Sequence, residues 1–191
     1  IRTGRPVQWM PTRSEDMVTL PHSRGQVQQV ELGCRDDGTF TNLRIRLLGD
    51  AGSYPTIGAY LPGGTRRMAQ GTYAFDGIEC DIAVAVTNTT SMGAYRGAGR
   101  PEATAMLERA VDQAALELDI DPIEIRKRNF LGDDMFPFTS LTGNTYDSGR
   151  YALPLSRAAE EVGYEQLRSE QAARRRSGDT ALLGIGVASY V

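Results

Sequence analysis

The sequence contains few of the residues that build metal and disulfide sites. Among its 191 residues are one histidine, His22, and two cysteines, Cys34 and Cys80. Structural zinc and iron–sulfur sites need several such ligands, commonly in a C-x-x-C spacing that does not occur here. Both cysteines lie in alternating apolar segments, which favours buried free thiols over a disulfide. The sequence therefore predicts no metal ion held by side chains of this chain.

The scarcity of histidine also limits acid–base and nucleophilic chemistry. A Ser–His–Asp triad would have to use His22, which lies in the loop-like run Pro21–Gly25, where a histidine is more often exposed than catalytic. The carboxylates are scattered, and no pair has a spacing that indicates shared acid–base work. The sequence thus gives little support to a hydrolytic triad.

Long apolar runs and a strong excess of one charge are absent as well. The chain is 40% hydrophobic and 24% charged, with a formal net charge of −3. No apolar run reaches the roughly 20 residues of a membrane span, and a slightly acidic chain is a poor general binder of nucleic acid. The basic run Arg174–Arg176 is interpreted as a solvated helix end that complements the helix dipole. We expect neither a membrane span nor a nucleic-acid partner.

The composition is that of one soluble globular domain with a core. The chain begins at Ile1 rather than methionine and stops within the apolar run 182–191, so we interpret it as an internal piece of a longer polypeptide. No secretory apolar segment is visible, which favours a cytoplasmic parent. A periplasmic location stays open, because the N-terminus of the parent would lie outside the chain.

Hydrophobic periodicity predicts strands in the first half. Apolar and polar residues alternate over 27–48 on both sides of the turn residues Asp36–Thr39, which predicts a β-hairpin. Arg5–Met10 and Ile82–Val86 are further strand candidates. The glycine- and proline-rich stretch 51–77 has no clear period, and we expect an ordered connection or a strand broken by turns there.

Helical spacing dominates the second half. Apolar residues from 103 to 118 fall on one stripe, and Asp121–Glu124 has the N-cap, proline and glutamate of a second helix start. A third helix is predicted around Leu155–Val162, interrupted by Gly163 and continued over Gln166–Arg176.

Together these elements predict an α+β fold in a single fragment of a domain, in which the hairpin packs against the first helix of the second half. We expect residues 1–92 to be mainly β and residues 93–180 to be mainly α, with a functional loop at 93–102. Residues 181–191 are expected to form a terminal strand.

The run Gly93–Glu102 is the most informative stretch of the sequence. Three small residues lie between Arg96 and Arg100, and Pro101 then opens the helical pattern. Glycine lets the backbone approach a ligand closely, and proline at the first helical position gives up an N–H that the helix does not use. The remaining N–H groups and the helix dipole favour negative charge in this loop. These physical arguments leave two interpretations open, an anion or cofactor site and a tight turn with solvated arginines.

The segment Ala94–Glu102 resembles the active-site loop of the molybdenum hydroxylases, the family of xanthine dehydrogenases, aldehyde oxidases and the large subunits of carbon monoxide dehydrogenase-like enzymes. Four other segments resemble family segments in the same order: Thr3–Val7, Arg13–Met17, Gly49–Tyr54 and Asp121–Phe130. Each motif is short, but together they cover nearly the whole chain. The resemblance implies a fragment of the molybdopterin-binding domain of the large subunit.

This resemblance also implies a specific chemistry. Members of the family insert a water-derived oxygen at an electron-poor carbon of an aldehyde or an N-heterocycle, and the electrons leave through iron–sulfur clusters to an acceptor. The implied cofactor is molybdopterin with molybdenum, around which the protein contributes orientation and electrostatics. The implied partners are the remaining segments of the large subunit and the iron–sulfur and FAD subunits or domains.

Roles for individual residues follow from the same resemblance. Arg96 would place positive charge beside the pterin and the substrate oxygen and is the candidate catalytic residue. Gly97 and Ala98 would present backbone N–H groups to the cofactor. His22 and Arg24 lie in a segment that approaches the substrate pocket in the family, and with Ala98 they are candidates for substrate contact. The implied cofactor contacts share the loop: Tyr95, Arg96, Gly97, Ala98 and Gly99.

Two departures from family patterns narrow the range of expected substrates. Carbon monoxide dehydrogenases proper carry a copper-binding cysteine where this chain has Gly97, so a copper–molybdenum site is not expected. Xanthine oxidases carry a phenylalanine that stacks on the flat substrate where this chain has Ala98, so a tight purine clamp is not expected. The pattern fits the aldehyde-oxidising branch better.

Several family segments do not occur in the chain, namely an upstream glycine-rich segment, a glutamine-rich cofactor loop and a C-terminal catalytic glutamate. We therefore expect that the fragment alone neither binds the cofactor tightly nor turns over. An alternative from another class stays open, in which the chain is a non-catalytic module. Such a module would use Gly93–Glu102 to bind an anion or to pack against a partner subunit.

Overall fold

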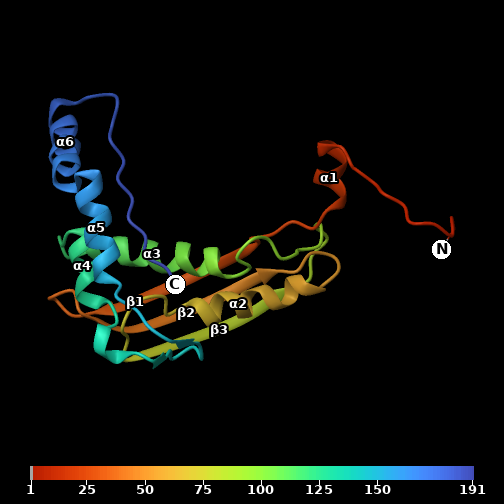
Figure 1. The fold of residues 1–191 in the computed structure, drawn as a ribbon, viewed down its shortest axis with the longest axis horizontal. Helices are drawn as coiled ribbons and strands as arrows, with labels where there is room; N and C mark the ends of the chain where they lie inside the picture. The colour runs from red at the N-terminus through yellow and green to blue at the C-terminus, as the bar shows by residue number, and fades with distance from the viewer. Residues whose placement is uncertain (1) are drawn as a thin grey trace.

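The computed structural model describes residues 2–191 and shows an elongated molecule (Figure 1). A three-stranded sheet forms its middle, and two helices, α2 (Leu61–Met68) and α3 (Arg100–Glu117), lie along one face of that sheet. The helices α5 (Ala152–Val162) and α6 (Tyr164–Ser177) rise from one end, and the N-terminal residues extend from the other.

The sheet has the strand order β1-β2-β3. Strands β1 (Gln26–Cys34) and β2 (Phe40–Asp50) form the predicted antiparallel hairpin. Strand β3 (Gly77–Ala85) pairs with β2 in parallel and includes most of the strand predicted at 82–86. Because parallel neighbours need a crossover connection, the chain between β2 and β3 passes over the sheet, and α2 forms part of that crossover.

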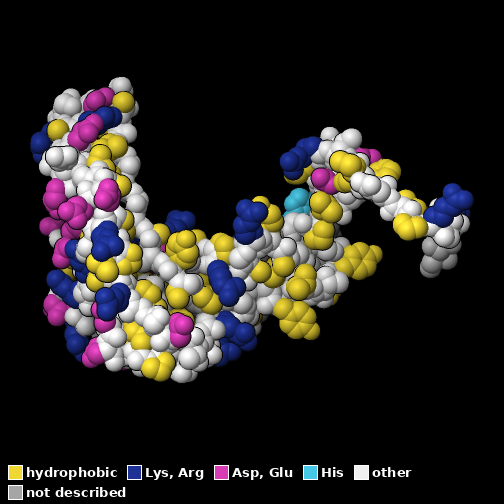
Figure 2. Space-filling view, viewed as in Figure 1, with side chains coloured by type: hydrophobic (Ala, Val, Ile, Leu, Met, Phe, Trp, Pro, Cys, Tyr) yellow, Lys and Arg dark blue, Asp and Glu magenta, His cyan; other side chains and the backbone are white. Residues whose placement is uncertain are grey.

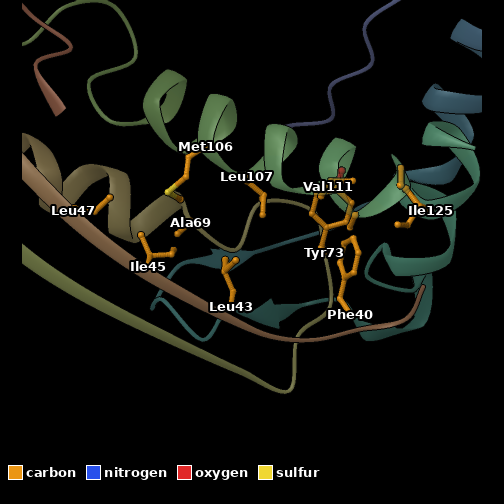
Figure 3. Close-up of a cluster of buried hydrophobic side chains, with 12 residues drawn as sticks. Phe40, Leu43, Ile45, Leu47, Ala69, Tyr73, Met106, Leu107, Val111 and Ile125 are labelled. Atoms are coloured by element: carbon orange, nitrogen blue, oxygen red, sulfur yellow. The ribbon is translucent and has the colours of Figure 1, made fainter. Parts of the chain in front are cut away.

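The core lies between β2 and α3 (Figure 3). Leu43, Ile45 and Leu47 on β2 point toward α3 and are 1%, 0% and 2% exposed. Burying a side chain of this size contributes about 1.5–3 kcal/mol, so this contact fixes α3 on the sheet. The predicted packing of the hairpin against this helix is confirmed. The α3 residues on the other side of the contact are buried as well: Met106, Leu107 and Val111.

The helices predicted in the second half are present. Helix α3 spans the apolar stripe, and α4 (Pro122–Asn129) begins after Asp121, whose carboxylate accepts from the N–H groups of Ile123 and Glu124. Gly163 has a φ of 66° and separates α5 from α6. No helix within residues 2–191 has the length and apolar composition needed to cross a bilayer. Short elements connect α4 to α5: η2 (Asp133–Met135), β4 (Phe138–Thr139) and β5 (Thr145–Tyr146).

Two helices lie where the sequence predicts none. Helix α1 (Arg13–Thr19) is capped by Thr12, whose hydroxyl accepts from the N–H of Glu15 in a capping box. Helix α2 follows the 3-10 turn η1 (Ile57–Tyr60), within the stretch predicted as a connection or a broken strand. Arg5–Met10, predicted as a strand, has no regular secondary structure. The first half of the chain therefore holds all three long strands and both of these helices.

The prediction of a terminal strand at 181–191 is wrong. These residues have no regular secondary structure and pair with no strand among residues 2–191. The C=O of Val187 instead accepts from Nη2 of Arg126 at 2.9 Å, and the N–H of Ser189 donates to the Glu108 carboxylate at 2.9 Å. Side chains of α3 and α4 thus bind backbone groups that a neighbouring strand would bind in a sheet.

Candidate cofactor-contact loop

The loop Gly93–Gly99 leads from the end of β3 to α3, and the segment around His22 holds its start. The N–H of His22 donates to the C=O of Ser91 at 3.1 Å, and the N–H of Gly93 donates to the C=O of His22 at 2.6 Å. The side chain of His22 is half-buried and forms no hydrogen bond within residues 2–191. His22 therefore lies beside the loop and contacts it through backbone atoms.

The carboxylate of Glu102 anchors the other end of the loop. Glu102 is 7% exposed, and its Oε2 accepts from the N–H of Gly99 and from Nη1 of Arg24, both at 2.9 Å. Negative charge is favoured at the N-terminus of α3, and here the helix supplies that charge from its own first turn. Because Glu102 is buried, loss of Arg24 would leave its carboxylate unpaired and away from water.

Arg24 holds the middle of the loop. Its Nη2 donates to the C=O of Arg96 at 2.6 Å, and its guanidinium lies 5.4 Å from the centroid of the Tyr95 ring. A cation over an aromatic face is attracted by the ring quadrupole. Together with the ion pair to Glu102 of α3, these contacts connect the half-buried Arg24 side chain to Tyr95 and Arg96 of the loop.

The three small residues between Arg96 and Arg100 all have positive φ, 92° at Gly97, 33° at Ala98 and 100° at Gly99. A Cβ added to Gly99 would lie 2.5 Å from the carbonyl carbon of Gly64, so only glycine lets α2 pack directly on the loop. The N–H of Ala98 donates to the C=O of Tyr95 at 2.8 Å. The expectation that Ala98 presents its N–H to a cofactor is therefore corrected, because this turn uses that group.

Several hydrogen-bond donors of the loop have no partner within residues 2–191, among them the Arg96 side chain and the N–H of Gly97. The Arg96 side chain is exposed and forms no ion pair or hydrogen bond within residues 2–191. The N–H of Gly97 also has no acceptor in this part of the chain. Both groups lie on a backbone that Arg24 and Glu102 hold in place, so they are available to a ligand without rearrangement of the loop.

A cleft of about 660 Å³ adjoins the loop. Ala98 and Arg100 line one side of this cleft, and residues of α2 line another. No group of three or more His, Cys, Asp and Glu side chains in the described part of the chain is placed to hold a metal ion. A ligand in this cleft would therefore be bound by backbone N–H groups and guanidinium groups.

Sequence reasoning brought most of these residues together but missed two contributors. Glu102 has no assigned role in the sequence analysis, and its partner Arg24 is 78 positions away, so no local signal indicates the pair. Helix α2 was missed although Pro62 near its start and Arg66–Arg67 at its end are helix start and stop signals.

The sequence of the loop and its surroundings matches a known family model. The model for the molybdopterin cofactor-binding domain matches residues 1–130. The chain belongs to this family. The matched residues include the whole sheet, the loop Gly93–Gly99, α3 and α4, and the resemblance to the molybdenum hydroxylases is confirmed.

Relatives of this chain are longer proteins. The carbon monoxide dehydrogenase large chain of Hydrogenophaga pseudoflava is 34% identical over 98% of this chain and 24% of its own length. The nicotine 6-hydroxylase large subunit of Paenarthrobacter nicotinovorans is 28% identical over 97% of this chain and 23% of its own length. The crystal structure of quinoline 2-oxidoreductase from Pseudomonas putida superposes with a TM-score of 0.84 at 30% identity, covering 93% of this chain and 23% of that chain. The chain thus spans about a quarter of these relatives, and the predicted α+β fold is confirmed.

Proposed function

We propose that this chain is part of a molybdenum-dependent oxidoreductase that hydroxylates an aldehyde or an N-heterocycle with water-derived oxygen. The exposed Arg96 side chain, which has no partner within residues 2–191, is the main support for this proposal. The backbone of Arg96 is held by Arg24. A guanidinium carried on a held backbone can donate several charge-assisted hydrogen bonds to anionic or developing-negative oxygens.

The loop residues fit a large cofactor rich in oxygen and nitrogen. The N–H of Gly97 has no acceptor within residues 2–191, the Tyr95 ring is held by Arg24, and Gly99 lets the loop backbone turn tightly against α2. Ala98 adds only a methyl group to the cleft wall. In the intact enzyme these residues would contact molybdopterin, which supplies the redox chemistry of oxygen insertion when bound. Arg96 would stabilise negative charge on the reacting oxygens.

The substrate class rests on two residues and on the relatives. Gly97 provides no thiolate at the position that the resemblance assigns to a copper-binding cysteine, so oxidation of carbon monoxide is not proposed. Ala98 leaves open a wall that a phenylalanine would fill. Two of the relatives carry the names of enzymes that oxidise N-heterocycles, nicotine and quinoline. These observations support an aldehyde or an N-heterocycle, with no tight clamp on a flat ring.

The partners follow from the redox chemistry. Hydroxylation with water-derived oxygen releases electrons, and the chain has no cluster of ligands within residues 2–191 that would hold a metal carrier for them. We therefore propose that it works with the remaining segments of a large subunit and with iron–sulfur and FAD subunits or domains. A cytoplasmic location is proposed, with the periplasm as the alternative.

The substitution Arg96→Ala in the intact subunit tests this function. We expect kcat/KM to fall about a hundred- to thousandfold, because a donor aimed at developing charge contributes about 2.7–4 kcal/mol. The melting temperature should change little, because an exposed and unpaired arginine contributes little to stability. The matched control is Arg35→Ala, an exposed arginine beside the hairpin turn at the far end of β1. A variant that melts earlier but turns over normally would remove Arg96 from the site.

The alternative of a non-catalytic anion-binding or subunit-packing module has less support. Its anion would lie at the N-terminus of α3, and Glu102 already supplies a carboxylate to the N–H of Gly99 there. Molybdenum content and turnover of the intact protein separate the two functions, since a module would have neither.

The purified 191-residue chain should itself contain no stoichiometric molybdenum. The reason is that the other cofactor-binding segments implied by the family resemblance do not occur in it. Elemental analysis that gives about one molybdenum per chain would contradict this expectation and would show that the loop alone retains the cofactor.

A further inference from the structure

The cleft beside the loop has a strongly basic lining. Arg66 and Arg67 from α2 and Arg100 from α3 line it, and no carboxylate does. None of the three forms an ion pair within residues 2–191. In the space-filling view, Lys and Arg side chains lie over α2 and the start of α3, whereas most Asp and Glu side chains lie at the end that carries α4 to α6 (Figure 2). The cleft is therefore electropositive.

Arg100 is unfavourably placed unless an anion lies nearby. It is the first residue of α3, where the positive end of the helix dipole typically disfavours a cation by about 0.3–1 kcal/mol. Glu102 in the same turn is bound to Arg24 instead. Arg66 and Arg67 lie in the last turn of α2, where the dipole favours cations, so the helix alone accounts for them. The third charge, on Arg100, is the one that the fold does not explain.

Gly63 lines the same cleft and has no role in packing. A Cβ added to Gly63 would meet no atom within 4 Å, whereas a Cβ on Gly64 would lie 2.8 Å from the carbonyl oxygen of Ala98. Glycine inside a helix costs about 0.5–1 kcal/mol relative to alanine. Close packing of α2 on the loop accounts for Gly64, but at Gly63 the glycine only keeps the helix backbone open toward the cleft.

We propose that this cleft binds an oxyanion, the carboxylate or phosphate group of a small ligand, through Arg66, Arg67 and Arg100. Both groups accept paired hydrogen bonds from guanidinium donors, and the space beside Gly63 admits them. The source of the oxyanion rests on the proposed function. It is either an acidic substrate, which would reach the cleft past Ala98, or a phosphate of the cofactor.

The test uses the intact subunit with Arg66→Gln, Arg67→Gln and Arg100→Gln, singly and combined. The matched control is Arg109→Gln, an exposed arginine of α3 that does not line the cleft. Titration calorimetry with inorganic phosphate and with benzoate measures anion affinity, and molybdenum and pterin assays measure cofactor content. These measurements do not depend on turnover.

Two results support the proposal and identify the source. If the oxyanion belongs to a substrate, the wild type binds the probes, and each variant weakens binding about tenfold or more, at unchanged cofactor content. If it belongs to the cofactor, the combined variant loses cofactor, and the loaded wild type binds no added phosphate. Gly63→Leu fills the cleft without changing its charge, so it should cause the same loss of probe binding or of cofactor. Leucine has a higher helix propensity than glycine, so this loss would not come from an unfolded α2.

Cofactor content and probe affinity equal to those of Arg109→Gln in every cleft variant would overturn the proposal. The outcome for the proposed function is separate. If the intact wild type contains no molybdenum but binds the probes through these arginines, the oxyanion site stands and the function fails. If molybdenum and turnover are normal and the arginines have no effect, the function stands and the oxyanion site fails.

Discussion

At the scale of single residues, the contacts of Arg24 differ from what its place in the sequence suggests. The sequence makes it a candidate for substrate contact. In the structure, its guanidinium binds the Glu102 carboxylate and the C=O of Arg96 and lies over the Tyr95 ring. Because its guanidinium is engaged in these contacts, we interpret Arg24 as a residue that positions the loop Gly93–Gly99. His22 contributes to the same task through its backbone.

Ala98 is the residue at which we expect substrate size to be selected. In the intact subunit, Ala98→Phe should lower kcat/KM for bulky aldehydes more than for small ones, because an aromatic ring fills space that a methyl group leaves open. Overpacking of this kind typically costs about 1–3 kcal/mol. The control is Ala105→Phe on the exposed face of α3. An equal loss for small and large substrates would show that Ala98 does not line the pocket.

At the scale of elements, Asp50 connects the end of the hairpin to the chain that enters the loop. It is the last residue of β2, and its carboxylate accepts from the N–H of Gly52 and from the hydroxyls of Thr87 and Thr89. The residues after β3 are thereby held against the end of β2, and the loop begins a few residues further on.

This contact predicts an acid-sensitive step in stability. The hydrogen bond from Gly52, followed by those from the threonines, holds the pKa of Asp50 below its ordinary value of 3.8. A group with a lowered pKa in the folded state stabilises fully above its unfolded pKa and loses that contribution as the pH falls through the folded one. We expect the melting temperature of the wild type to fall more steeply below about pH 4 than that of Asp50→Asn. Parallel curves for the two proteins would show that Asp50 is not involved.

Elements with a strong period were predictable, and elements that depend on distant contacts were not. The hairpin and α3 follow from apolar spacing alone. Helix α2 contains a proline and two glycines, which disfavour a helix locally, and it packs on Gly99. Residues 181–191 alternate like a strand, but a strand also needs a neighbour, and the described chain pairs them with none.

The candidate site was predictable to a similar degree. Glycines between arginines before a helix indicated the loop, because that pattern has a local physical reason. The Arg24–Glu102 pair joins residues far apart in the sequence, so it becomes visible only in the fold. The N–H of Ala98 was expected to face a ligand, but the turn that the glycines permit uses it internally.

At the scale of the whole molecule, a buried ionic network joins the helices to the C-terminal segment. Arg126 is fully buried and donates to Glu108 at 2.9 Å, to Asp112 at 2.7 Å and to the C=O of Val187 at 2.9 Å. The hydroxyl of Tyr73 donates to Glu108 at 2.6 Å. Burial raises the pKa of Tyr73, with a further contribution from the Glu108 charge, so this hydroxyl stays a neutral donor.

Replacing Arg126 should therefore be strongly destabilising. We expect Arg126→Met to cost about 3–5 kcal/mol, because it leaves the buried carboxylate of Glu108 without its cation. The control is Lys127→Met, which removes an exposed ion pair with Glu124 and should cost about 1 kcal/mol or less. Melting temperatures of the intact subunit compare the two. A second change, Glu108→Leu, should recover part of the loss, and equal melting of Arg126→Met and wild type would contradict the assignment.

The same network has a consequence for the order in which the polypeptide is synthesised. Val187 leaves the ribosome 61 residues after Arg126, and Ser189 follows Glu108 by 81 residues. Until these residues emerge, the guanidinium and the carboxylate lack acceptors and donors that the finished fold provides, and water must occupy their places. The ionic centre beside α3 and α4 is therefore completed only after residues 187–189 have emerged, and a chain released before residue 187 would leave these groups to water.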